Sequence, residues 1–518
     1  MRNLIYLIIS GLMIINLSCD SDFEEININP NTVPGDQFNP ALLLTTAQLQ
    51  TALSGEDIYT DKYYCAAFVQ HFSSLSNVGI HDWHGDKYVY HQENSEMLWY
   101  NTYQHGKLLQ DLIQLSKDKS EYHNLYYMAK IWNVLIYHRL TDLYGDAPYS
   151  EAGLAYYESI YKPKYDSQES IYDQMLNQLD EAVDKLDASQ NNFQSADIAY
   201  DGNIEQWKKM GNSLMLRLAM RLSKVDPAKS EQWVKKAYAK KLLASNDDNL
   251  AIKALDPDAI NEALSNPSSI KFSRSSTGKI SATFFNYLKE RNDPRLKYIA
   301  MVYDDPRDIS TKNDDPAVQK GMPNGLDRQT LINDPSYILD HPAQENQYSS
   351  INREVYGKLD GNRMFITYAE VQFMLAEAAV KGWIPGDAKN FYEEGVKGDM
   401  KNLINYEETA IISEVKIQDF LTQNPFVGTS NKEAALEQIN NQYWVATFMN
   451  GCEAFANYRR SGYPALVPVN YLDNETGGLR PGRLMYPKNE AVLNPENYKE
   501  AVARQGTDSF ITHVWWDK

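Results

Sequence analysis

Residues that could do chemistry gather between positions 78 and 103, where histidines and aromatic side chains stand among polar ones. His81 and His84 are three residues apart, with Asp82 and Asp86 beside them. Histidine and carboxylate side chains at short spacing can bind a metal ion. This spacing alone is weak evidence, however, and a polar loop with scattered histidines is the favoured interpretation. We therefore assign no metal to this stretch.

The aromatic residues of the same stretch allow two interpretations. Trp99 and Tyr103 are four residues apart and lead into an apolar periodic run, so we expect them on the buried face of a helix. Trp83 and Tyr88 precede that helix in a segment that contains glycine and aspartate. A tryptophan there either fills the core or offers a flat face to a sugar or a peptide side chain. Both interpretations remain open from the residues alone.

Patterns typical of enzymes are missing from the sequence. It holds no Gly-x-Ser-x-Gly elbow, no phosphate-binding loop and no His-Glu-x-x-His motif. The GGLRPG stretch near Gly477 follows no predicted strand, so it is not a dinucleotide fingerprint. The 69 acidic residues leave a glycosidase carboxylate pair open by count, but none stands in an unusual apolar setting. We assign no catalytic residue, and a secreted glycoside hydrolase remains the alternative of another class.

The chain opens with an apolar segment that ends at a cysteine. Arg2 is followed by an uncharged run to Cys19, which is shorter than the about 20 apolar residues that span a bilayer. Such a run is typical of a secretory signal peptide. The acidic, Asn-rich sequence after Cys19 makes the segment similar to a bacterial lipoprotein signal. We predict a signal peptide over residues 1–18, a lipid anchor at Cys19 and a flexible acidic tether over residues 19–40.

Cysteine count and net charge narrow the possible partners. If Cys19 carries lipid, only Cys65 and Cys452 remain; they could pair, but we favour small buried side chains. The chain is therefore neither a disulfide scaffold nor a cysteine-based zinc protein. A net charge of −19 disfavours a nucleic acid partner, because phosphate binding requires a basic face.

Periodic apolar spacing indicates helices that would position these residues. Intervals of three and four recur along five stretches, each read as an amphipathic helix with one buried face. These are residues 121–140, 170–189, 204–223, 366–382 and 434–460. We expect the fold to be mainly α, with Trp132, Trp207 and Trp444 in its core. The paired helices suggest a tetratricopeptide-like stack, although no clean repeat period is visible.

Residues 251–365 differ from the helical parts. They are rich in Asp, Asn, Pro, Ser and Gly, which predicts long loops with a few short elements between two helical halves. Long loops on a rigid frame are common places for recognition.

An ordered set of motifs carries a family resemblance. From about residue 40 to the C-terminus the sequence resembles the SusD/RagB nutrient-binding outer-membrane lipoproteins, in particular their SusD-like subgroup. The motifs that carry the resemblance are RLTDLYGDAPYSEA, YDSQESIYDQMLNQLDEAV, DGNIEQWKKMGNSLMLRLAMRLSKVDP, YAEVQFMLAEAAVKGW, YWVATFMNGCEAFANYRRSGYPAL and RQGTDSFITHVWWD.

The resemblance implies a fold for residues 41–518 in which four tetratricopeptide-like units frame a loop-rich half. It implies a lid on a SusC-like TonB-dependent β-barrel, which holds a nutrient at the outer face of the outer membrane for import. It also implies no enzymatic activity and no obligatory cofactor. We expect an oligosaccharide as the nutrient, with a peptide as the alternative, because the subgroup contains both.

On the same basis we expect the ligand to contact the loops at residues 76–92 and 255–360. The candidate ligand contacts in these loops, all aromatic or polar side chains, are Trp83, Tyr88, His81, His84, Tyr348 and Asn352.

Overall fold

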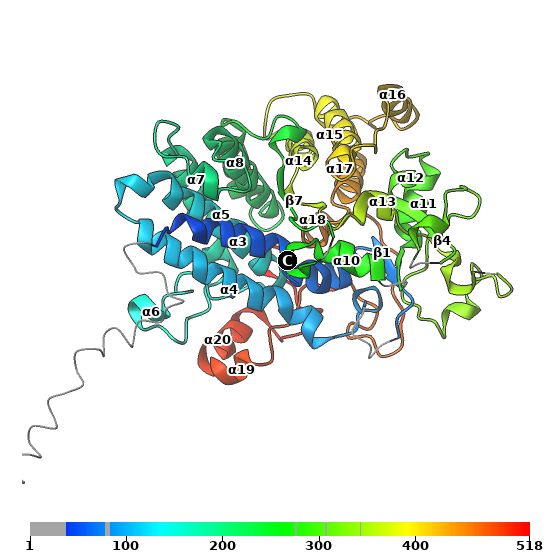
Figure 1. Cartoon of the computed structure of the whole chain (residues 1–518), viewed down its shortest axis with the longest axis horizontal. Coiled ribbons are helices and arrows are strands. Elements are labelled where there is room, and N and C mark those ends of the chain that lie inside the picture. Colours follow the sequence, from blue (N-terminus) through cyan, green and yellow to red (C-terminus); the bar gives the residue numbers. More distant parts are fainter. Residues whose placement is uncertain are drawn as a thin grey trace, which may run out of the picture.

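The computed structural model describes residues 38–77, 83–258, 260–274, 277–305, 308–341 and 343–517. Helices dominate this part of the chain and the strands are short (Figure 1), so the fold is mainly α, as predicted. The predicted signal peptide, Cys19 and most of the tether lie outside the described residues, and so does His81. No helix of the described ranges is long and apolar enough to cross a membrane.

The first group of helices forms a stack in which each long helix packs against the next one in the chain. Its members are α3 (Ala41–Leu53), α4 (Gln92–Ser116), α5 (His123–Tyr144), α7 (Gln168–Lys185), α8 (Ile204–Arg221) and α9 (Pro227–Tyr238), with the short α6 (Ala155–Glu158) between α5 and α7. Ser167, Asn203 and Asp226 cap α7, α8 and α9 by accepting hydrogen bonds from first-turn amides. Each such cap contributes about 1 kcal/mol.

The second group of helices packs on the first through α8 and α14. Its members are α14 (Tyr368–Lys381), α15 (Ala388–Asn402), α16 (Glu414–Gln423), α17 (Lys432–Ala446) and α18 (Gly451–Ser461), followed by α19 (Glu490–Leu493) and α20 (Pro495–Gln505). Gly382 ends α14 with a φ of 78°, in the left-handed region that glycine adopts without steric cost. Helix α14 contacts both α15 and α17, which makes it the centre of this group.

The prediction of a single helix over residues 434–460 was wrong, because the structure has two helices, α17 and α18, with a break between them. Met449 in the break has a φ of 71°, which an α-helix cannot include. Helix α18 begins at Gly451, where a Cβ would collide with the backbone carbonyl of Asp61. Packing on a distant segment therefore sets the break, and the local apolar spacing does not report it.

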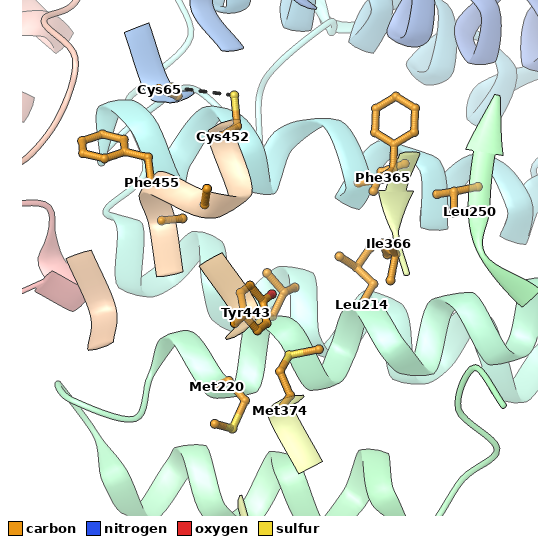
Figure 2. Close-up of a cluster of buried hydrophobic side chains, with 14 of the residues drawn as sticks. Cys65, Leu214, Met220, Leu250, Phe365, Ile366, Met374, Tyr443, Cys452 and Phe455 are labelled. Carbon is orange, nitrogen blue, oxygen red and sulfur yellow. Dashed lines mark hydrogen bonds between the residues drawn. The ribbon is translucent and has the colours of Figure 1, made fainter. Parts of the chain in front are cut away.

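That distant segment is η2 (Asp57–Ala66), a ten-residue stretch of wide π-type turns. Such turns are rare and mostly occur singly, and no feature of the sequence predicted them. Cys65 of η2 and Cys452 of α18 are buried free thiols whose Sγ atoms lie 3.8 Å apart (Figure 2). They are the small buried side chains that the sequence analysis favoured.

Short antiparallel pairings hold the loop-rich half together. Strands β1 (Phe72–Ser74) and β3 (Gly278–Ile280) form one pair, and β2 (Leu250–Lys253) and β7 (Asn362–Ile366) form another. The third sheet has the order β5 (Lys312–Asn313), β4 (Ala300–Tyr303), β6 (Ser350–Ile351). Four short helices accompany them: α10 (Pro267–Arg274), α11 (Ala282–Glu290), α12 (Leu296–Ile299) and α13 (Arg353–Tyr356).

One large core runs through both helical groups. Figure 2 shows Leu214 and Met220 from α8 beside Met374 from α14 and Tyr443 from α17. Trp132, Trp207 and Trp444 are all buried in this core, as predicted. Each indole N–H has an acceptor, on Thr51, Asp197 and Val69 respectively.

Candidate functional site

Three loops that are far apart in sequence meet beside β1, and we call the region they form the loop face. It consists of residues 75–77 and 83–91, residues 322–341 and 343–348, and residues 464–480. The amide of Arg328 donates to the carbonyl of Leu75 over 3.2 Å, and the amide of Glu475 donates to the carbonyl of Tyr88 over 2.8 Å. A small apolar cluster beneath these loops joins Leu75, Met322, Leu331 and Tyr348.

A buried ion pair fixes the path of the first loop at η3 (Gly85–Lys87). The Asp86 carboxylate accepts from the amide of Ser74 over 2.9 Å, and the Lys87 ammonium lies 3.0 Å from it. The same ammonium donates to the Ser74 carbonyl over 2.9 Å. Burial raises the pKa of Asp86, and the charge of Lys87 opposes that rise. Because both side chains are fully enclosed, the pair positions the loop and offers nothing to a ligand.

Trp83 fills the core beneath the same loop. Its indole is 2% exposed, with the ring centres of Tyr63 and Phe72 at 4.7 and 5.1 Å. A Cβ on Gly278 would come within 2.6 Å of the indole, so β3 closes the remaining side. Of the two interpretations that the sequence left open, the packing favours the core.

Tyr88 and His84 are also enclosed. Tyr88 ends η3 with a φ of 58° and packs edge-on against Phe68, with 5.8 Å between ring centres. The His84 ring stacks on His91 at 4.7 Å, and its Nδ1 lies 3.4 Å from the side-chain nitrogen of Asn94. Tyr88 thus holds the loop against Phe68, just after η2, and His84 holds it against the start of α4.

Tyr348 and Asn352 have structural contacts as well. The Tyr348 hydroxyl lies 2.9 Å from that of Ser336, and its ring belongs to the apolar cluster under the loop face. Asn352 caps α13, accepting from the amide of Glu354 over 3.1 Å and donating to the carbonyl of Lys297 over 3.2 Å. The five candidate contacts that the structure describes are therefore buried, and the expectation that they meet a ligand directly has no support from their packing.

Other side chains form the outer surface of the loop face, and sequence reasoning missed them. Leu472 is 81% and Leu339 is 72% exposed, and Ile332, Ile338, Val467 and Leu479 are exposed too. Two half-buried tyrosines, Tyr337 and Tyr471, supply aromatic rings. In the sequence each of these tyrosines stands alone beside an aliphatic residue, in loops rich in Asn, Asp and Pro, and so lacks the aromatic density of the stretch near Trp83.

Tyr471 is held in place from below. Its hydroxyl donates to the Asp327 carboxylate over 2.8 Å, and the Lys87 ammonium lies 6.0 Å from its ring centre. Burial would raise the pKa of Asp327, but hydrogen bonds from Thr330 and Tyr471 outweigh it and leave the pKa below its ordinary value. The carboxylate thus stays charged and acts as a fixed acceptor for the tyrosine.

The side chains on the outer surface of the loop face are suited to contact with a ligand. Exposed aliphatic side chains and tyrosine rings suit the C–H faces of a sugar or apolar peptide side chains. Within the described ranges, no three His, Cys, Asp or Glu side chains gather closely enough to hold a metal ion.

A family model described as "Starch-binding associating with outer membrane", SusD-like, matches residues 30–487. The chain belongs to the SusD-like family. The ordered motifs of the sequence therefore identified the family correctly, and the mainly helical architecture is that of SusD-like proteins.

Solved structures agree with this assignment over nearly the whole SusD-like chain. A chitin-binding protein is 33% identical in sequence to this chain. The match covers 92% of this chain and 100% of the chitin-binding protein, with a TM-score of 0.80. A Bacteroidetes AC2a SusD-like protein shares 27% identity over 93% of this chain and 100% of its own, with a TM-score of 0.81. A chitin-binding SusD homologue from Flavobacterium johnsoniae is 24% identical, and the match covers 93% of this chain and 99% of the homologue with a TM-score of 0.77. At this identity the match shows a shared fold alone. The search of curated proteins gave no match.

Proposed function

We propose that this SusD-like protein is a lipid-anchored protein of the outer membrane that captures an oligosaccharide at the cell surface. It would deliver the oligosaccharide to a SusC-like TonB-dependent transporter, without altering it. The observation that carries the proposal is the match, over 92% of this chain, to a chitin-binding protein at 33% identity. We therefore propose a chitin-type oligomer of N-acetylglucosamine as the ligand.

The composition of the loop face supports a ligand of this kind. Leu339 and Leu472 offer aliphatic contacts for acetyl methyl groups, and Tyr337 and Tyr471 offer ring faces for sugar C–H groups. The surface is open, so much of a bound ligand stays in water. Binding must also order the rotatable bonds of the ligand, which costs free energy. We expect modest affinity for the protein alone, and tighter binding when the barrel partner closes over the site.

Calorimetric titration with chitin oligomers, starch oligomers and mixed peptides tests the ligand class. We expect binding of chitin oligomers and an affinity loss of about tenfold or more when Tyr337→Ala and Tyr471→Ala are combined, since stacking on each ring contributes about 1 kcal/mol. Tyr156→Ala is the matched control, because Tyr156 is 86% exposed but lies on α6, on the other side of the molecule (Figure 1). Binding of peptides alone would support the peptide alternative.

The binding role also predicts that the ligand leaves unchanged. Chromatography of chitin oligomers after incubation with the purified protein should show no shortened products. Turnover that a single carboxylate substitution abolishes would favour the glycoside hydrolase alternative instead.

A further inference from the structure

A pocket of about 260 Å³ lies outside the loop face, between α11, α12, the loop at residues 314–319 and α16. Figure 1 shows these three helices on the right of the molecule. Its wall is largely apolar, and Phe285, Ala300 and Met301 are buried there. The remaining apolar lining comes from Pro294, Leu296 and Pro316. None of the proposed glycan contacts lines it, so the pocket has no part in the function proposed above.

Three lysines surround the opening: Lys289 from α11, Lys297 from α12 and Lys416 from α16. All three are exposed, and in the described part of the chain none forms an ion pair. The ammonium of Lys289 lies 5.7 Å from the ring centre of Phe285, so its aliphatic stem runs along the apolar wall. This arrangement, with the stem on apolar surface and the charge in water, is common for lysine.

The carboxylates of the lining do not cancel these charges. Asp293 is buried and paired with Arg295 over 2.5 Å, which leaves Asp314 as the exposed acid of the lining. The opening is therefore locally positive on a chain whose net charge is −19. A local cationic cluster attracts anions.

We propose that this lysine-rimmed pocket binds an amphipathic carboxylate, a molecule with one carboxylate on a small apolar body. The body would lie against Phe285 and Met301, and the carboxylate would accept charge-assisted hydrogen bonds from the lysines. The volume lies just below the ~300–1,000 Å³ of pockets for drug-sized ligands, so the body must be small. A neutral sugar has neither the charge nor the apolar body that this pocket matches.

Displacement of anilinonaphthalene sulfonate, a fluorescent apolar anion, by carboxylates of increasing chain length tests the proposal. From hexanoate to dodecanoate we expect affinity to rise by up to about fourfold per methylene until the body fills the pocket. Dodecanol, which has the same chain without the charge, should bind at least tenfold more weakly than dodecanoate. Equal binding of the two would overturn the proposal.

Two matched variants locate the site. Combining Lys289→Gln, Lys297→Gln and Lys416→Gln should weaken dodecanoate binding at least tenfold. The control removes the same charge from exposed positions elsewhere by combining Lys162→Gln, Lys432→Gln and Lys499→Gln. It should leave the affinity for dodecanoate unchanged. Equal effects of the two sets would refute the site. The single change Lys416→Glu repeats the test with less disturbance, and unaltered binding there would count against the pocket as well.

Discussion

Trp83 lies between η2, β1 and β3 with its indole enclosed by Tyr63, Phe72 and Gly278. Because replacing a buried tryptophan leaves a cavity, we expect Trp83→Ala to lower the free energy of unfolding by about 3–5 kcal/mol. Urea unfolding followed by circular dichroism measures this loss. Trp233→Ala on α9 is the control, since Trp233 is half-buried and its removal should cost less. A variant with unchanged stability and lost glycan binding would instead put the indole in contact with the ligand.

Only part of the candidate site could be predicted from its residues. The dense aromatic run near Trp83 lies in one of the loops that build the loop face. The burial of Trp83 could not be foreseen, because Phe72 and Gly278, which enclose its indole, are 206 positions apart. They come together only through the pairing of β1 with β3, which local spacing does not report. The exposed contacts, Tyr337 and Tyr471, stand alone in polar loops and give no periodic signal.

Glu377 of α14 joins three helices of the second group. Its carboxylate accepts two hydrogen bonds from Arg460 of α18, over 2.6 and 2.8 Å, and one from Asn440 of α17 over 3.2 Å. Burial alone would raise the pKa of Glu377, but the Arg460 charge and these hydrogen bonds lower it to about 2. We expect Glu377→Gln to cost about 3–5 kcal/mol at neutral pH, because it leaves the Arg460 charge buried without its partner.

The pH dependence of that loss has a definite sign. A carboxyl with a pKa of about 2 in the folded state and 4.5 in the unfolded state stabilises the fold above pH 4.5, and this stabilisation is lost as the pH falls toward 2. The difference in unfolding free energy between wild type and Glu377→Gln should therefore shrink over that range. Glu393→Gln, which removes a surface pair with Lys389, should cost less than about 1 kcal/mol at any pH. A Glu377→Gln effect as small as this control would contradict the assignment.

The sequence predicted the long helices well. It did not predict the break between α17 and α18, the wide turns of η2 or the short strands. The stretches 121–140 and 204–223 each became one long helix, α5 and α8, because three-to-four spacing of apolar residues is a local property. The break before Gly451 and the wide turns of η2 depend on each other across the core, so neither leaves a local trace. Strands such as β5 and β6 are two residues long, too short for an alternating pattern.

The whole molecule separates its frame from its recognition surfaces. The two helical groups share one core, whereas the loop face is built by loops between the helices and the lysine-rimmed pocket lies between α11, α12 and α16. A rigid frame whose loops are held by buried contacts loses little conformational entropy when a ligand binds. This division explains how the loops can be tied down by buried side chains such as Asp86 and still carry exposed contacts such as Leu472.

The proposed lipid anchor makes a prediction about the protein as a whole. If Cys19 carries several acyl chains, each buried methylene contributes about 0.8 kcal/mol and together they hold the protein on the membrane. We expect Cys19→Ala to move the protein from the membrane fraction to the soluble fraction, and its unfolding midpoint to stay unchanged, because the helical frame starts at α3. Cys65→Ala is the matched cysteine control and should remain with the membranes, since Cys65 is buried in the core. Membrane retention of Cys19→Ala equal to that of Cys65→Ala would rule out this cysteine as the anchor.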